Sequence, residues 1–170
     1  IRDALTNPDP AIALAVSLIA FHALTTQQVQ HVQLTDIIDG RLRMPDGRSI
    51  PLAKPVRVRL TAWLDHRAKR WPETKNPYLL VTIQTAPRLS PPSRNFPWRK
   101  AGVTAQALRT DRILYEVEQT GGDVRRVCDL FGIGIETALR YSATILEPPT
   151  PGERAPTHTG EIDNESASTV

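Results

Sequence analysis

The longest run of apolar residues, AIALAVSLIAFHAL at positions 11–24, contains only two polar side chains. A segment without a polar face is typical of a helix that is buried on all sides. Asp9 stands where an N-cap residue is expected and Pro10 at the first helical position, so the pattern predicts a buried helix over 10–23. The run of 14 residues is too short to cross a bilayer, and we expect no membrane association.

Shorter patterns predict the elements that follow. Thr25 with Gln28 three residues later forms a capping-box pattern, which predicts a second helix to about residue 32. The turn signal Pro45-Asp46-Gly47 between short runs predicts a hairpin. Apolar residues at helical spacing predict a helix over 54–71, and PYLLVT at 77–82 predicts a strand.

The last third of the chain predicts three more helices after a proline-rich loop at 84–103. Caps at Thr104 and Asp123 begin the first two, over about 105–120 and 124–131, and the lone cysteine of the second is predicted to be a buried thiol. The final helix starts near Ile135 and ends by Leu146. Its spacing predicts a buried stripe formed by Ile135, Ala138, Leu139, Ser142 and Ile145.

The predicted fold is therefore mainly α with a small antiparallel β-sheet of two or three strands, an α+β domain over residues 1–146. Residues 147–170 are rich in Pro, Ser, Thr and acidic residues and have no apolar periodicity. They predict a disordered acidic tail.

The predicted domain and the predicted tail differ in net charge. The formal net charge is +3, but residues 1–146 hold 20 basic and 13 acidic side chains, a net charge of +7. A basic body favours a polyanionic partner such as nucleic acid, although high-GC genomes also enrich arginine for unrelated reasons. The single cysteine excludes an internal disulfide framework. Separately, we expect the protein to be bacterial and cytoplasmic.

One stretch carries a family resemblance: ALRTDRILYEVEQTGGDVRRVCDLFGIGIETALRY, residues 107–141. It resembles the tyrosine recombinase (phage integrase) motif H-x-L-R-H … GG-D-L-R-x-V-x-x-L-L-G-H … I-x-T-T-x-x-Y. The resemblance extends weakly over residues 10–146, where FHALTTQQVQHVQLTDI stands in place of T-G-L-R-x-S-E-L-x-x-L-x-W-x-D-I. It implies the fold of that family's catalytic domain, and we expect the family's N-terminal arm domain to be absent from these residues.

In that family a tyrosine attacks the scissile phosphate and forms a 3′-phosphotyrosyl bond, while two arginines stabilise the added charge. The resemblance implies double-stranded DNA as partner, no metal and no cofactor, and DNA-templated homo-oligomers. Position by position, Tyr141 stands at the nucleophile, Arg109 at the second arginine and Arg43 at or near the hairpin lysine. Arg125, Arg126 and Arg140 are candidate DNA contacts near the glycine turn.

Other motif positions depart from the family. The first arginine and its neighbouring acid fall on Thr25 and Gln28, the two histidines of H-x-L-R-H fall on Gln106 and Thr110, and the assisting His or Trp falls on Ile133. Loss of a single transition-state donor typically costs about 10²–10³ in rate. The pattern therefore predicts a degraded active site in which efficient strand transfer is lost.

Each candidate also has a structural interpretation. Tyr141 is a nucleophile, a DNA contact or a packing residue, and the arginines are phosphate ligands or solvated surface charges. Thr25 and Gln28 are explained by helix capping alone. VRRVCDLFGIGIETALRY also resembles a helix-turn-helix, in which the last helix would read the major groove without catalysis. A third possibility is a fold that now makes only protein contacts.

Overall fold

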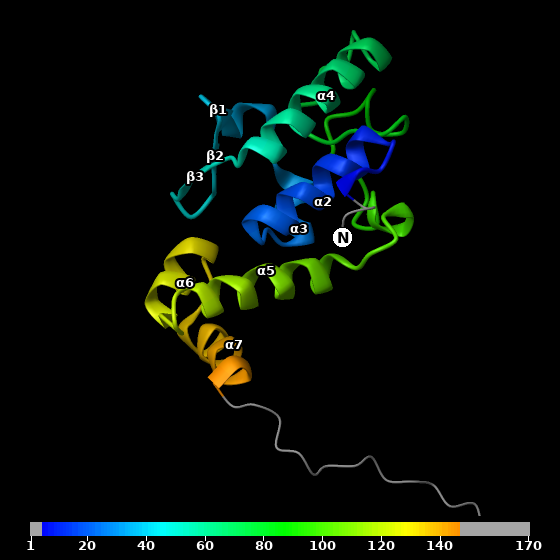
Figure 1. The fold of residues 1–170 in the computed structure, drawn as a ribbon. Coiled ribbons are helices and arrows are strands. Elements are labelled where there is room, and N and C mark those ends of the chain that lie inside the picture. Colours follow the sequence, from blue (N-terminus) through cyan, green and yellow to red (C-terminus); the bar gives the residue numbers. More distant parts are fainter. Residues whose placement is uncertain (1–4, 147–170) are drawn as a thin grey trace, which may run out of the picture.

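The computed structural model describes residues 5–146 and confirms the predicted fold class (Figure 1). The helices are α2 (Pro10–His22), α3 (Thr26–His31), α4 (Lys54–Arg70), α5 (Ala105–Gln119), α6 (Val124–Phe131) and α7 (Ile135–Leu146). The strands β1 (Ile37–Ile38), β2 (Arg41–Arg43) and β3 (Ser49–Pro51) form one antiparallel sheet in the order β1-β2-β3. No helix within 5–146 has the length and apolarity needed to cross a membrane.

Helix α2 is the centre of the larger hydrophobic core, as its composition predicts. Every side chain from Ala11 to Ile19 is buried, and the Asp9 carboxylate caps the helix by accepting the Ala11 N–H at 2.9 Å. In Figure 1, α2 lies between α4 on one side and α5 on the other. We call this cluster the first core; it also takes residues from α3, the sheet, α4 and the segment 79–81.

The segment predicted as a strand at 77–82 is buried at residues 79–81, bends at residues 79 and 80, and joins no sheet. Leu79, Leu80 and Val81 lie in the first core, and the one bridge described here is that of Tyr78 with Gln33. The Trp63 indole N–H donates to the Leu79 carbonyl at 2.8 Å. The strand prediction is wrong because side chains and loops, rather than a neighbouring strand, bind this backbone.

Helix α5 connects the first core to a second, smaller one. Its Leu108 belongs to the first core, whereas Ile113 and Val117, one and two turns later, belong to the second. We call this smaller cluster the second core; it consists of Ala23, Ile113, Val117, Val127, Phe131 and Ala138. Helices α6 and α7 therefore fold onto the C-terminal half of α5, and the figure shows them beside that end of it.

The predicted buried stripe of α7 is wrong in part. Ala138 and Ser142 are buried, but Ile135 is 66% and Leu139 51% exposed. The helix instead faces the second core with Ala138 and Tyr141, so its inward face is rotated towards the tyrosine. Cys128 is half-buried rather than buried. The side chain of Ile145 and the predicted tail lie outside the described part of the chain.

Candidate functional site

Arg109 lies on α5 between Leu108 of the first core and Ile113 of the second core. Helix α5 begins at the cap residue Thr104, whose hydroxyl accepts the Ala107 N–H at 3.1 Å, and this start places Arg109 one residue after the buried Leu108. The Arg109 guanidinium is half-buried and donates from Nη1 to the carbonyl oxygen of Ala23. Ala23 ends α2 in the left-handed conformation at φ 51°, which directs its carbonyl away from the helix axis.

Two further side chains lie within electrostatic reach of this guanidinium. Burial lowers the pKa of Arg109, the Tyr141 hydroxyl group raises it, and the Arg48 charge lowers it. Charges influence one another over about 10 Å at about 0.1 M salt. Arg109 from α5 and Arg48 from the turn between β2 and β3 donate to the carbonyls of Ala23 and Leu130 at the second core, and Tyr141 from α7 packs against the same core.

Tyr141 combines packing with an available hydroxyl group. Its ring is half-buried and packs against the second core. Its hydroxyl makes no hydrogen bond with any residue in the described range. A ring held by packing and a hydroxyl without a partner fit either a nucleophile or a phosphate contact.

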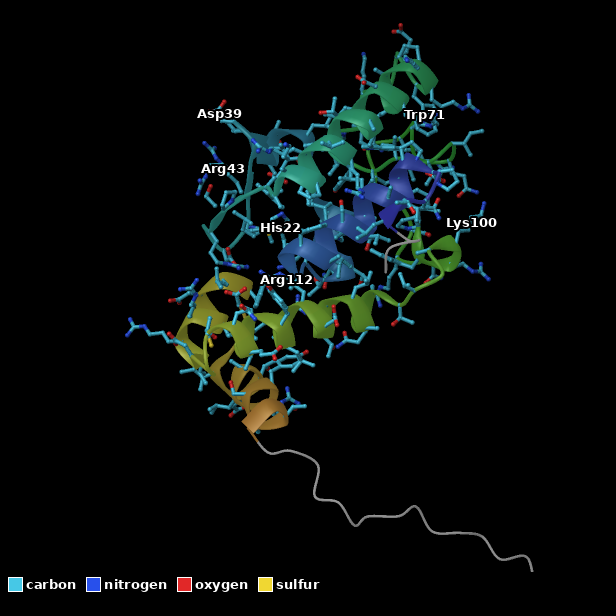
Figure 2. The ribbon with its side chains drawn as sticks, viewed as in Figure 1. His22, Asp39, Arg43, Trp71, Lys100 and Arg112 are labelled. Atoms are coloured by element: carbon cyan, nitrogen blue, oxygen red, sulfur yellow. The ribbon has the colours of Figure 1, made fainter. Side chains whose placement is uncertain are left out.

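The hairpin directs Arg48, rather than Arg43, towards this site. Arg43 lies on β2 with an exposed side chain, and Figure 2 shows it at the margin of the molecule, away from α5. Arg48 donates from Nη1 to the Leu130 carbonyl at 2.9 Å and from Nε to Asp46 at 2.7 Å. Sequence comparison alone missed Arg48; the available signal was its place immediately after the Pro45-Asp46-Gly47 turn, at the tip of the hairpin.

The three arginines predicted to contact DNA all have exposed side chains around α6 and α7. Arg126 lies 3.6 Å from Glu116, and Arg140 donates to Thr137 at 3.3 Å. The first contact joins α6 to α5 and the second lies within α7, and both leave the arginine side chains exposed, so they neither require nor exclude a phosphate. DNA contact by Arg125, Arg126 and Arg140 stays a prediction.

The motif positions that depart from the family have structural occupants. The Thr25 hydroxyl accepts the Gln28 N–H at 3.1 Å, and the Gln28 side chain accepts the Thr25 N–H at 2.8 Å, which confirms the capping box. Gln106 and Thr110 contact each other at 3.3 Å on α5. Ile133 packs against the second core. None of these five side chains carries a charge that could assist a phosphate reaction.

A separate hollow of about 890 Å³ lies between the end of α2, the start of α4 and α5. Arg112 lines it, donating to the Phe21 carbonyl at 3.1 Å and to Glu116 at 2.9 Å. The neighbouring His22 accepts the Ala53 N–H at 3.3 Å, and burial together with Arg112 lowers its pKa to about 4. Figure 2 shows His22 and Arg112 between α4 and α5, and because both have protein partners we regard this network as structural.

Comparison with known proteins supports the fold. No protein-family model and no curated protein sequence matches the chain. Among solved structures, the XerA recombinase matches with a TM-score of 0.63 and 22% identity over 87% of this chain and 62% of its own. The XerH site-specific recombinase, solved as a post-cleavage complex with its palindromic difH substrate, matches with a TM-score of 0.59 and 17% identity over 79% and 43%. This chain therefore spans less than two thirds of either protein, and residues 5–146 have the fold of a tyrosine recombinase domain.

Proposed function

We propose that this chain binds double-stranded DNA through the surface around Arg109 and Tyr141, in recombination or integration or in a process descended from them. The observation that carries the proposal is that a recombinase fold places Tyr141, whose hydroxyl has no partner among the described residues, and the half-buried Arg109 at the same small core. The XerH structure, which holds its DNA substrate, supports DNA as the partner class. The net charge of +7 on residues 1–146 favours the same partner.

The arrangement defines what a strand-cleaving reaction would require. Tyr141 would attack the scissile phosphorus through its hydroxyl oxygen, form a phosphotyrosyl bond to the 3′ side and release the 5′-hydroxyl. Arg109 would stabilise the charge of the transition state. The hydroxyl proton must leave and the 5′ oxygen must gain one, but Thr25, Gln106, Thr110 and Ile133 supply no acid or base. We therefore propose that strand transfer is strongly reduced while DNA binding is kept.

The decisive experiment separates binding from chemistry. Wild type and Tyr141→Phe are incubated with nicked suicide DNA duplexes, and binding is measured by anisotropy and covalent adducts by denaturing gel. We expect equal, salt-dependent binding by both proteins, because only the hydroxyl is lost. Any adduct formed by wild type should disappear in Tyr141→Phe. Absence of salt-sensitive binding by wild type would reject the proposal.

The helix-turn-helix alternative is favoured by one observation, the exposed face of α7 that follows the short turn after Gly132. It would place Arg140 in the DNA groove and leave Arg109 away from the DNA. Arg109→Gln and Arg140→Gln remove the same charge from the two candidate faces. A larger loss of affinity in Arg109→Gln supports the recombinase-like surface, and a larger loss in Arg140→Gln supports the helix-turn-helix.

A further inference from the structure

The β2–β3 hairpin contributes to the site a cation, Arg48, that stands away from Arg43, the position matched to the family's hairpin lysine. The side chain of Arg48 is only 22% exposed although it lies at a hairpin tip. It reaches across 82 positions of sequence to the last turn of α6, where Nη1 donates to the Leu130 carbonyl. An arginine held this way is positioned before any ligand arrives, which lowers the entropy lost on binding.

Gly132 makes this position possible. The residue ends α6 in the left-handed conformation at φ 60°. A Cβ atom added there would lie 2.3 Å from Nη2 of Arg48 and 2.5 Å from Cζ. Any other residue at this position would have to displace the guanidinium, so the glycine and the arginine fit together as one arrangement.

This arrangement has positive charge that an anion can neutralise. Arg48 donates to the carbonyl of Leu130, which precedes Phe131 of the second core, and Arg109 donates to the carbonyl of Ala23 in the same core. Both cations therefore border the second core, and the Arg48 charge lowers the pKa of Arg109 accordingly. Asp46, 45% exposed, partly neutralises Arg48 through the 2.7 Å ion pair. Exposed ion pairs of this kind contribute about 0–1 kcal/mol, so a stronger anion would displace the carboxylate readily.

We propose that Arg48 and Arg109 together bind one phosphate of the DNA backbone, and that Asp46 occupies Arg48 until DNA arrives. The guanidinium forks of two arginines match the oxygens of a phosphate. Arg48 would then supply, from the hairpin, the second positive charge that Thr25 does not provide. This inference rests on the proposed DNA-binding function and adds a residue and a local competitor to the same surface.

The test uses the full chain and a fluorescent DNA duplex of about 30 base pairs of random sequence, with anisotropy titrations across a range of salt concentrations. Arg48→Gln is compared with Arg70→Gln, which removes the same charge at the far end of α4, where Arg70 lies over the Trp71 ring at 5.8 Å. Asp46→Asn is compared with Asp39→Asn, which removes an exposed acid from the turn between β1 and β2. Thermal unfolding is recorded for every variant.

We expect Arg48→Gln to weaken binding roughly tenfold and to lower the salt slope by about one, as for loss of one phosphate contact. Arg70→Gln should do neither. Asp46→Asn should tighten binding about two- to fivefold beyond Asp39→Asn, and this gain should disappear in the Arg48→Gln background. Asp46→Asn keeps the bond to Leu130, so it tests the inference even if Arg48→Gln unfolds.

Two results would overturn the inference and leave the proposed function intact. One is wild-type DNA binding with an unchanged salt slope in Arg48→Gln, whether or not its unfolding temperature falls, because Arg48 would then be structural only. The other is equal affinity of Asp46→Asn and Asp39→Asn. Absence of any salt-dependent DNA binding by wild type is a different failure, because it removes the proposed function itself.

Discussion

The two hydrophobic cores differ in size and in what holds them. Among the described residues, the first core contains 21 buried residues around α2, whereas the second contains six. The second core includes Ala23, the residue that follows α2 and ends it. The stability of small clusters is limited by the apolar area they bury. We infer that α6 and α7 are the least stable part of the fold, although they carry Tyr141.

This difference explains how the candidate site is built. Arg109 lies on α5 between the two cores and is anchored to the end of α2, while Tyr141 depends on the second core alone. Arg48 joins the hairpin to α6 through a hydrogen bond rather than through apolar packing. The site is therefore assembled across a boundary between a strongly packed and a weakly packed region.

The prediction with the largest expected change in unfolding free energy compares a cavity in the first core with a cavity in the second. Phe131→Ala should cost about 3–5 kcal/mol and Leu14→Ala about 2–5 kcal/mol of unfolding free energy. Hydrogen exchange should show loss of protection confined to α6 and α7 in Phe131→Ala, and throughout the fold in Leu14→Ala. Loss of protection everywhere in both variants would show that the two cores unfold as one unit.

A second test uses pH, because His22 lies where α2 meets α4 and α5. Its pKa is lowered from 6.5 to about 4 by burial and by Arg112. Between these values the unfolded chain binds a proton that the folded chain excludes, so stability is complete above about pH 6.5 and falls as pH decreases towards 4. We expect a loss of roughly 2 kcal/mol at pH 5 in urea unfolding.

The control for this pH dependence is His22→Gln, which has no titrating group at the same place. Its unfolding free energy should change little between pH 7 and pH 5. An equal loss in the variant and in wild type would assign the effect to other groups.

The next test addresses the boundary at Gly132. Gly132→Ala and Gly121→Ala both place a Cβ at positive φ, 60° and 63°, and both should lose about 1–2 kcal/mol from backbone strain. Gly132→Ala alone would also collide with Arg48, whereas nothing lies within 4 Å of a Cβ at Gly121. A larger loss in Gly132→Ala, measured by chemical unfolding, confirms the close approach; equal losses would contradict it.

The smallest test compares a buried serine from each region. The Ser17 hydroxyl donates to the Leu14 carbonyl at 2.8 Å, whereas the buried Ser142 Oγ has no partner within the described structure. Removing an unsatisfied hydroxyl relieves its desolvation cost. Ser142→Ala should therefore stabilise the fold by about 1 kcal/mol in calorimetry, and Ser17→Ala should not. A destabilising Ser142→Ala would indicate an unseen partner at that hydroxyl.

The sequence predicts the fold well wherever local chemistry determines the structure. Asp9, Thr25, Thr104 and Asp123 cap their helices as predicted, because each side chain bonds only to its own helix. The predictions that fail depend on contacts between distant segments. Apolar content favoured burial of Ile135 and Leu139, but the direction from which α5 approaches α7 decided which face was covered.

The predictions for the candidate site also divide into those that local sequence supports and those that depend on contacts between distant segments. The motif locates Arg109 and Tyr141, and in the structure Arg109 bonds to Ala23 of the second core while Tyr141 packs against that core. Arg48 could not be predicted, because its carbonyl partner lies 82 residues away and depends on how the hairpin meets α6. The match of Arg43 to the family's hairpin lysine depends on counting residues across a turn, and this role stays a prediction, because an exposed side chain on β2 neither supports nor excludes it.

The bond from Arg48 to Leu130 has a thermodynamic consequence of its own. The heat capacity of an opening reaction rises with the apolar area it exposes and falls with the polar area. Separation of the hairpin from α6 breaks this polar bond while the six residues of the second core stay packed. Its heat capacity change should therefore be close to zero, so the opening equilibrium should follow a nearly straight van't Hoff line. Global unfolding, which exposes the first core, should give a strongly curved one.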